Sequence, residues 1–263
     1  MVETELLNWT LQQFLVLLVV VTRVGPLIFL MPVFGSRAVP VQVKILVTLT
    51  IAFILVPVVD VSVDAMPTST LGYGIFVLSE VAFAGILALF ARFIFAAVQL
   101  AGQYVSISMG MGMAAAMDPQ FGTQTSLVGV FWNLIATLIF LSLDGHHIFL
   151  RVMSESFAWV RPGSLHLTEA TFEGILQGVT HMFVLGVKVM APAGAALFFS
   201  HVAMGILAKT VPQIPVMIVA MPMNIGLGFI FIGLSLSYFL PLMASNFDML
   251  NRSLVRLAMG MGG

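Results

Sequence analysis

Three side chains of the types that bind metal ions, Asp144, His146 and His147, lie within four residues of the chain. Imidazole nitrogens and carboxylate oxygens are ligands that a zinc ion accepts. The sequence places no further donor beside them, and Gly145, directly after an apolar run, is typical of a helix C-cap. Imidazoles near a helix C-terminus also interact favourably with the helix dipole. The sequence therefore favours a structural cap with interfacial histidines, and we predict neither a metal nor a cofactor.

Charged side chains also lie inside apolar segments, namely those of Arg23, Glu80, Arg92 and Lys188. Each would cost roughly 2.5–3.5 kcal/mol at the centre of a bilayer, so we expect them to face protein or water. One hypothesis is a small secondary transporter or ion channel that moves an ion or a proton along Glu80, Arg92 and Lys188. His181 shares a helix face with Lys188, which we interpret as a polar seam against a neighbouring helix, with Glu80 as its candidate partner. The alternative interpretation is a titrating pair that relays protons.

A polar stripe follows Arg92 along the same predicted helix. Gln99, Gln103 and Ser106 return to within about 40° of its direction at 100° per residue. The stripe fits a helix that lines a water-accessible path. It equally fits a contact between helices or subunits, in which glutamine side chains hydrogen-bond across the interface. Both interpretations stay open, and a pore built from several chains satisfies both.

The stripe leads into a segment in which methionines alternate with glycines and alanines. Thioether side chains are flexible and polarizable, and glycine permits a close approach of the backbone. We interpret the segment as a deformable seal that yields and recloses, with ordinary core filling as the alternative. The predicted plug residues are Met109, Gly110, Met111, Gly112, Met113 and Met117.

Signatures of catalysis are missing from the sequence. It contains no HExxH, no GxSxG and no glycine-rich phosphate loop with its lysine. We therefore predict that the protein is not an enzyme. The alternative from that class is an intramembrane enzyme that uses Asp144, His146 and His147.

The composition indicates that these residues belong to a membrane protein. Of 263 residues only 10 are Lys or Arg and 11 are Asp or Glu, so 8% are charged, whereas a soluble domain carries about 25%. Hydrophobic residues reach 60%, and the mean hydropathy is +1.11. Soluble enzymes and disordered chains are excluded, and a net charge of −1 offers no footprint for nucleic acid. We predict an all-α integral membrane protein, without disulfides because the chain has no cysteine.

Apolar runs of nearly 20 residues, the length that crosses a bilayer as a helix, occur six times. A distribution of charges that favours an outside N-terminus and an inside C-terminus requires an odd number of crossings. We therefore expect one run to be re-entrant or buried in an assembly. Residues 245–257 are predicted to form an amphipathic helix at an interface. Residues 144–173, between the fourth and fifth runs, are predicted to be a turn-rich connection. The runs are Leu11–Met31, Val41–Val59, Leu71–Val98, Leu127–Leu143, Ile175–Phe199 and Ile214–Met243.

Taken in order, several short motifs resemble the FliR family of the flagellar type III export gate, which is related to the T-type components of virulence secretion systems. No single motif is specific, but their order and spacing together are. Asn224 stands where the family has a basic residue. The matching motifs are Arg23, Pro32-Val-Phe-Gly35, Val39-Pro40, Pro57, Asp118-Pro-Gln-Phe-Gly122, Asn133-Leu134, Leu143-Asp-Gly-His-His147, Val211-Pro-Gln-Ile214 and Pro222.

The resemblance implies a structural pore subunit that helps to form and plug a channel for unfolded flagellar proteins. It implies one such chain with five FliP and four FliQ subunits in a helical stack of bent hairpins. It further implies the export components FlhB and FlhA as partners, and the bacterial inner membrane at the flagellar basal body as the location. Residues 1–200 would be FliP-like and residues 201–263 FliQ-like. The turn that anchors the plug would comprise Asp118, Pro119, Gln120, Phe121 and Gly122.

Overall fold

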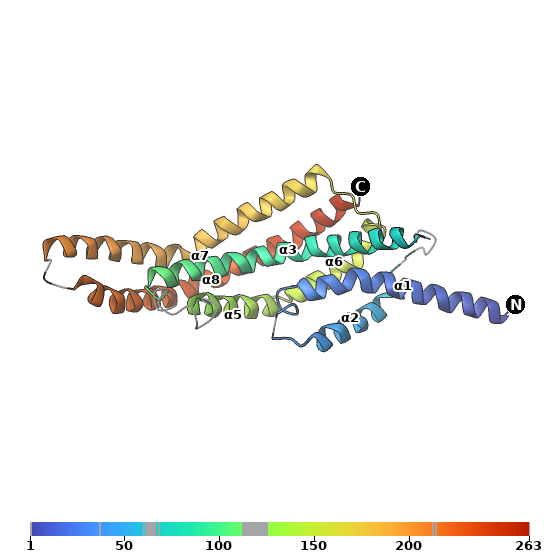
Figure 1. The fold of residues 1–263 in the computed structure, drawn as a ribbon, viewed down its shortest axis with the longest axis horizontal. Helices are drawn as coiled ribbons and strands as arrows, with labels where there is room; N and C mark the ends of the chain where they lie inside the picture. Colours follow the sequence, from blue (N-terminus) through green and yellow to red (C-terminus); the bar gives the residue numbers. More distant parts are fainter. Residues whose placement is uncertain are drawn as a thin grey trace. The chain divides into compact units, whose positions relative to one another are not determined.

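The computed structural model describes residues 2–36, 38–59, 61, 67, 69–111, 126–211, 213 and 215–262. These residues are almost entirely helical and contain no strand, which confirms the predicted all-α class (Figure 1). The helices are α1 (Val2–Leu30), α2 (Val41–Leu55), α3 (Thr70–Ser108), α5 (Leu127–Ser142), α6 (Gly145–Trp159), α7 (Glu169–Thr210) and α8 (Val216–Met261).

Four helices are long and apolar enough to cross a membrane, and a fifth span arises if the bent pair α5 and α6 counts as one. The run that falls short is the second, because α2 ends at Leu55 after 15 residues. At 1.5 Å per residue this helix reaches only about 22 Å, less than the roughly 30 Å of a hydrocarbon core. The expectation that not all six runs are plain spans is thus supported. The four spans are Trp9–Leu30, Thr70–Ser108, Glu169–Thr210 and Ile218–Met261.

The predicted turn-rich connection at residues 144–173 is wrong, because this stretch contains α6. The buried positions of α6, Phe149, Val152, Met153, Ser156 and Phe157, follow the helical spacing of three and four residues, so the signal is present in the sequence. The helix predicted at residues 245–257 is found as the C-terminal part of α8, which runs through two internal prolines.

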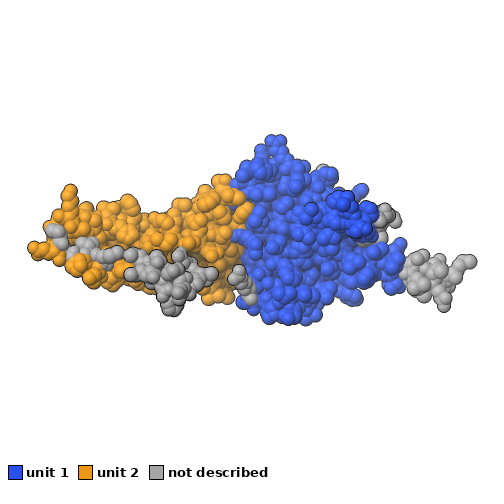
Figure 2. All heavy atoms as spheres, in the orientation of Figure 1, with its two compact units in different colours: residues 1–92, 144–178, 248–263 blue, residues 93–143, 179–247 orange. Residues whose placement is uncertain are grey.

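Two compact units make up the described chain (Figure 2). Unit 1 comprises residues 1–92, 144–178 and 248–263, drawn in blue, and unit 2 comprises residues 93–143 and 179–247, drawn in orange. Helices α3, α7 and α8 each contribute residues to both units. The expected division near residue 200 into two family-like parts concerns a likeness to other subunits, and it stays a prediction.

Unit 1 is built on the contact between α1 and α2, where Gly25 lies against the Thr48 methyl group. Its C-terminal end is held by backbone, because the His166 N–H donates to the Met261 carbonyl at 3.1 Å. In α7, Gly174 makes room for the Leu257 side chain of α8. The C-terminal turns of α8 therefore belong to the core of this unit.

Unit 2 contains an aromatic cluster contributed by three helices. The Phe95 ring of α3 lies 5.9 Å from the ring of Phe140 on α5 and 5.9 Å from that of Phe247 on α8. Phe140 and Phe247 close the triangle at 5.2 Å, and Trp132 stacks on Phe239 at 6.2 Å. Edge-on and offset ring pairs at such distances stabilise beyond their buried area.

Within unit 2, α7 and α8 form a hairpin that is joined by polar contacts. His181 Nε2 lies 2.6 Å from Asn246 Oδ1, and the Ser200 hydroxyl donates to Asn224 Oδ1 at 2.6 Å. The seam predicted for His181 is therefore present, although Lys188 is exposed and the partner is Asn246 instead of Glu80. Asn224 is buried and contributes to this hairpin.

Candidate functional site

Among the residues that the structure describes, the most deeply buried charge is that of Arg23 in α1, whose side chain is 0% exposed. Its Nε donates to Glu80 Oε2 at 2.5 Å and its Nη2 donates to Glu80 Oε1 at 3.1 Å, which makes a bidentate ion pair between α1 and α3. Nη1 donates to the carbonyls of Ser156 at 3.2 Å and Val160 at 3.1 Å, at the end of α6. The guanidinium group also lies over the Phe83 and Phe157 rings. Arg23 thus joins three helices of unit 1.

Glu80 makes a further contact that fixes a loop. Its Oε1 accepts the Gly163 N–H at 2.8 Å, just after α6. Gly163 has a φ of +81°, and a Cβ at this position would lie 2.6 Å from the Phe76 ring. Only glycine therefore suits both the backbone angle and the space. The Arg23–Glu80 ion pair is therefore a buried structural contact, in which the guanidinium nitrogens and the carboxylate oxygens have hydrogen-bond partners.

The three residues of the transporter hypothesis have different environments. The Glu80 carboxylate accepts hydrogen bonds from the Arg23 guanidinium group and the Gly163 N–H. Arg92 and Lys188 are exposed on the surface of the chain. The prediction that intramembrane charges face protein therefore holds within the chain for Arg23 and Glu80. For the prediction to hold for Arg92 and Lys188, these side chains must face water or another subunit.

Three of the four residues in the α3 polar stripe lie on the surface of the single chain. Arg92, Gln99 and Gln103 are exposed, whereas Ser106 is 6% exposed. The stripe is therefore available to a partner or to an aqueous path. Both interpretations from the sequence stay open.

The described end of α3 contains the first residues of the predicted plug. Gly110 takes a φ of +84°, its N–H donates to Ile107 O at 2.9 Å, and the Met111 N–H donates to Ser106 O at 3.1 Å. These two bonds form a Schellman C-cap, in which glycine is preferred because of its positive φ. Met109 directly before it is 0% exposed. A Cβ at Gly228 of α8 would lie 2.5 Å from the Met109 Sδ, so the Met109 side chain packs directly against this glycine.

The other predicted plug residues, Gly112, Met113 and Met117, lie outside the described residues, as do the anchor residues Asp118, Pro119, Gln120, Phe121 and Gly122. The described chain resumes at Ser126, which caps α5. Its hydroxyl accepts the Gly129 N–H at 2.9 Å and donates to the Gly102 carbonyl of α3 at 2.9 Å. The chain is thus fixed to unit 2 on both sides of residues 112–125. The sequence analysis missed Ser126, although a serine before an apolar run is the usual N-cap signal.

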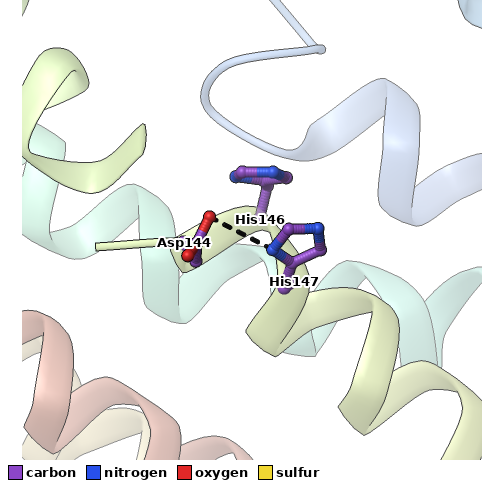
Figure 3. Close-up of side chains that lie close together, drawn as sticks. All are labelled: Asp144, His146 and His147. Carbon is purple, nitrogen blue, oxygen red and sulfur yellow. Dashed lines mark ion pairs between the residues drawn. The ribbon is translucent and has the colours of Figure 1, made fainter. Parts of the chain in front are cut away.

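Asp144, His146 and His147 lie at the start of α6, and Figure 3 shows their side chains close together. One ligand atom from each residue lies within 4.8 Å of the others. His147 Nδ1 is 3.2 Å from Asp144 Oδ1, and the two imidazole rings are 4.2 Å apart. The predicted C-cap at Gly145 is wrong, because Asp144 takes the left-handed conformation with a φ of 53° and Gly145 begins α6. The histidines therefore lie at a helix N-terminus, and the predicted favourable interaction with a C-terminal dipole is absent.

Comparison with known proteins agrees with the fold and with the motifs. The family model described as bacterial export proteins, family 1, matches residues 14–250. The chain is 31% identical over 229 residues to the flagellar biosynthetic protein FliR of Bacillus subtilis, which covers 85% of this chain and 87% of that protein. It belongs to the FliR family. The FliR of Pectobacterium carotovorum is 27% identical over 259 residues, 97% of each chain, and that of Aquifex aeolicus is 27% identical over 240 residues.

Several of the motifs on which the resemblance rests fall at the ends of helices. In the turn after α1, the Gly35 N–H donates to Met31 O at 2.7 Å, and a Cβ at Gly35 would meet the backbone oxygens of Met31 and Phe29. Pro40 directly precedes α2, and residues 143–147 form the corner between α5 and α6. As a FliR-family protein with four or five apolar spans, the chain is a component of the flagellar export apparatus in the inner membrane.

Proposed function

We propose that the chain is a pore subunit of the flagellar protein export gate and that the segment beginning at Met109 plugs the channel when no substrate passes. The observation that carries the plug is the end of α3. There a buried Met109 and a glycine C-cap at Gly110 fix where the Met-rich segment leaves the helix. Ser126 fixes where the chain returns.

The physical argument concerns a seal that must open for a polypeptide and exclude ions afterwards. Such a seal needs side chains that conform to irregular surfaces and a backbone that changes conformation at low cost. Methionine and glycine supply these two properties. Firm attachment at both ends lets the segment move without loss of its position relative to α3 and α5.

Partner subunits supply the rest of the channel in this proposal. FliP and FliQ, in five and four copies, would cover the exposed apolar side chains of this chain, and Arg92, Gln99 and Gln103 would contact them or line the path. Large apolar side chains on α2, α3 and α8 support a covered surface, since Phe53 is 74%, Leu71 79% and Ile218 71% exposed. FlhA and FlhB would act with the gate, and unfolded flagellar proteins would be its substrates.

Deletion of residues 110–116 is expected to raise small-ion leakage through the assembled gate severalfold, because the seal is removed while the helices that build the gate remain. The measurement is ion conductance across a membrane that contains the co-expressed complex, with co-purification of FliP and FliQ as the check on assembly. A matched control replaces the same seven residues with a glycine–serine linker of equal length. Leakage in both variants supports a seal made by the methionines. Wild-type conductance in the deletion variant would defeat the plug.

Expression of the chain alone is expected to give heterogeneous or aggregated material, because its exposed apolar side chains include many that a partner would cover. Size-exclusion chromatography in mild detergent measures this, and co-expression with FliP and FliQ is expected to restore a single species. Native mass spectrometry of that species then gives the copy number of each subunit. A stable, monodisperse monomer from the chain alone would contradict the proposed assembly.

A further inference from the structure

We propose that Asp144, His146 and His147 form a binding site for a divalent transition-metal ion, with Zn²⁺ as the ion that it takes. The site is independent of the proposed pore function. Two imidazoles and one carboxylate are ligands that zinc accepts, and three protein ligands leave a fourth position for water or another group. All three residues belong to unit 1 and come from the same corner of the chain.

The geometry is close to that of a bound ion. In a tetrahedral site with zinc–ligand bonds of 2.0–2.1 Å, neighbouring ligand atoms are about 3.3 Å apart. His147 Nδ1 and Asp144 Oδ1 lie at 3.2 Å, and the whole group of three lies within 4.8 Å. An approach of at most about 1.5 Å by the His146 donor would complete the set.

The Asp144 carboxylate does not cap the helix that follows it. An aspartate directly before a helix usually accepts a backbone N–H of the first turn. Asp144 makes no such bond with its side chain, and its carboxylate faces His147 Nδ1 instead (Figure 3). The helix begins without this cap, which leaves the carboxylate available as a ligand and as a negative charge against the positive end of the helix dipole.

His146 contains a buried nitrogen atom that has no hydrogen-bond partner. Among the described residues, His146 Nδ1 is one of two buried side-chain nitrogen or oxygen atoms without a hydrogen-bond partner, the other being Trp132 Nε1. A buried polar atom left unpaired destabilises the folded chain. Asp144 and His147 beside it are 72% and 65% exposed, so an ion can reach the cluster from outside. A cation bound at His146 Nδ1 would give this atom a partner.

The test uses the full-length chain with its co-purified partners, isolated through an affinity tag without histidines. Zn²⁺ alone is titrated calorimetrically, and Co²⁺ is added separately as a spectroscopic probe of tetrahedral coordination by its visible absorption. We expect one zinc per chain that is lost in His147→Ala, and at least about tenfold weaker binding in Asp144→Asn, since even outer-sphere partners of a ligand change metal affinity 10–100-fold. Asparagine tolerates the left-handed backbone of residue 144, so this variant keeps the corner intact.

The matched control is His201→Ala, which removes an exposed imidazole of α7 outside the cluster. This variant should bind zinc and cobalt like the wild type. Unchanged binding in His147→Ala, or an equal loss in His201→Ala, would mean that surface histidines bind the ion nonspecifically, and it would overturn the site. Wild-type affinity in Asp144→Asn would equally overturn it, because the carboxylate is one of its three ligands.

Discussion

Replacement of Glu80 by alanine is expected to destabilise the chain by about 3–5 kcal/mol, because it leaves the Arg23 guanidinium buried without its counter-ion. Arg23 is 0% exposed and Glu80 2%, so water cannot compensate. The Gly163 N–H loses its acceptor at the same time. The effect is measured as the temperature at which the tagged chain, in detergent-solubilised membranes, loses its solubility.

A double variant separates the loss of the pair from the burial of a lone charge. Arg23→Met combined with Glu80→Leu removes both charges and keeps an apolar volume between α1 and α3. Buried pairs replaced in this manner often cost little, so we expect the double variant to recover much of the stability. Glu155→Ala is the matched control, since Arg151 and Glu155 form an exposed pair at 2.8 Å that contributes little to stability. Equal losses in Glu80→Ala and Glu155→Ala would contradict the structural role of the buried pair.

Replacement of Gly102 by alanine is expected to destabilise unit 2 by about 3 kcal/mol or more, from overpacking together with loss of a helix cap. A Cβ at Gly102 would lie 2.5 Å from the Gly129 backbone nitrogen and still closer to its Cα. Backbone atoms cannot rotate away, so α3 and α5 would separate. Ser126 would then lose its bond to the Gly102 carbonyl and its position as the cap of α5.

Glycines with empty surroundings provide the control for this substitution. Gly205 of α7 and Gly226 of α8 have no neighbouring atom within 4 Å of an added Cβ. Alanine at these helical positions should stabilise by about 0.5–1 kcal/mol. The sign of the effect is thus expected to be opposite at Gly102 and at the control glycines in the same thermal solubility assay. A Gly102→Ala chain as stable as the wild type would contradict the close contact of α3 with α5.

Local patterns explain most of the elements that could be predicted. All six apolar runs lie within a helix or overlap one closely, because a continuous apolar stretch in a membrane has few alternatives to a helix. The α6 helix was missed because its mixture of polar and apolar residues resembles a connection when only hydropathy is read. Its buried positions at helical spacing carried the information.

Local sequence patterns predict less about the candidate sites than about the helices. The corner at 144–147 could be recognised from its residue types, but the φ of 53° at Asp144, which moves the histidines to a helix N-terminus, could not be. A C-cap glycine and a left-handed aspartate satisfy the same sequence rule, and packing of α6 selects between them. The anchors Met109 and Ser126 depend likewise on glycines of α8 and α3 that are distant in sequence.

Composition and apolar runs are enough to predict a helical membrane protein whose few intramembrane charges cannot face lipid, because burying an unpaired charge costs more than a single helix can offset. Which of these charges find partners within the chain depends on how the helices pack. Arg23 and Glu80 are 57 positions apart and pair because α1 and α3 both contribute to unit 1. Arg92 and Lys188 lie on surfaces that this chain leaves uncovered. Ion pairing depends on distances of a few ångströms, and these are set by how helices pack and not by the order of residues within them.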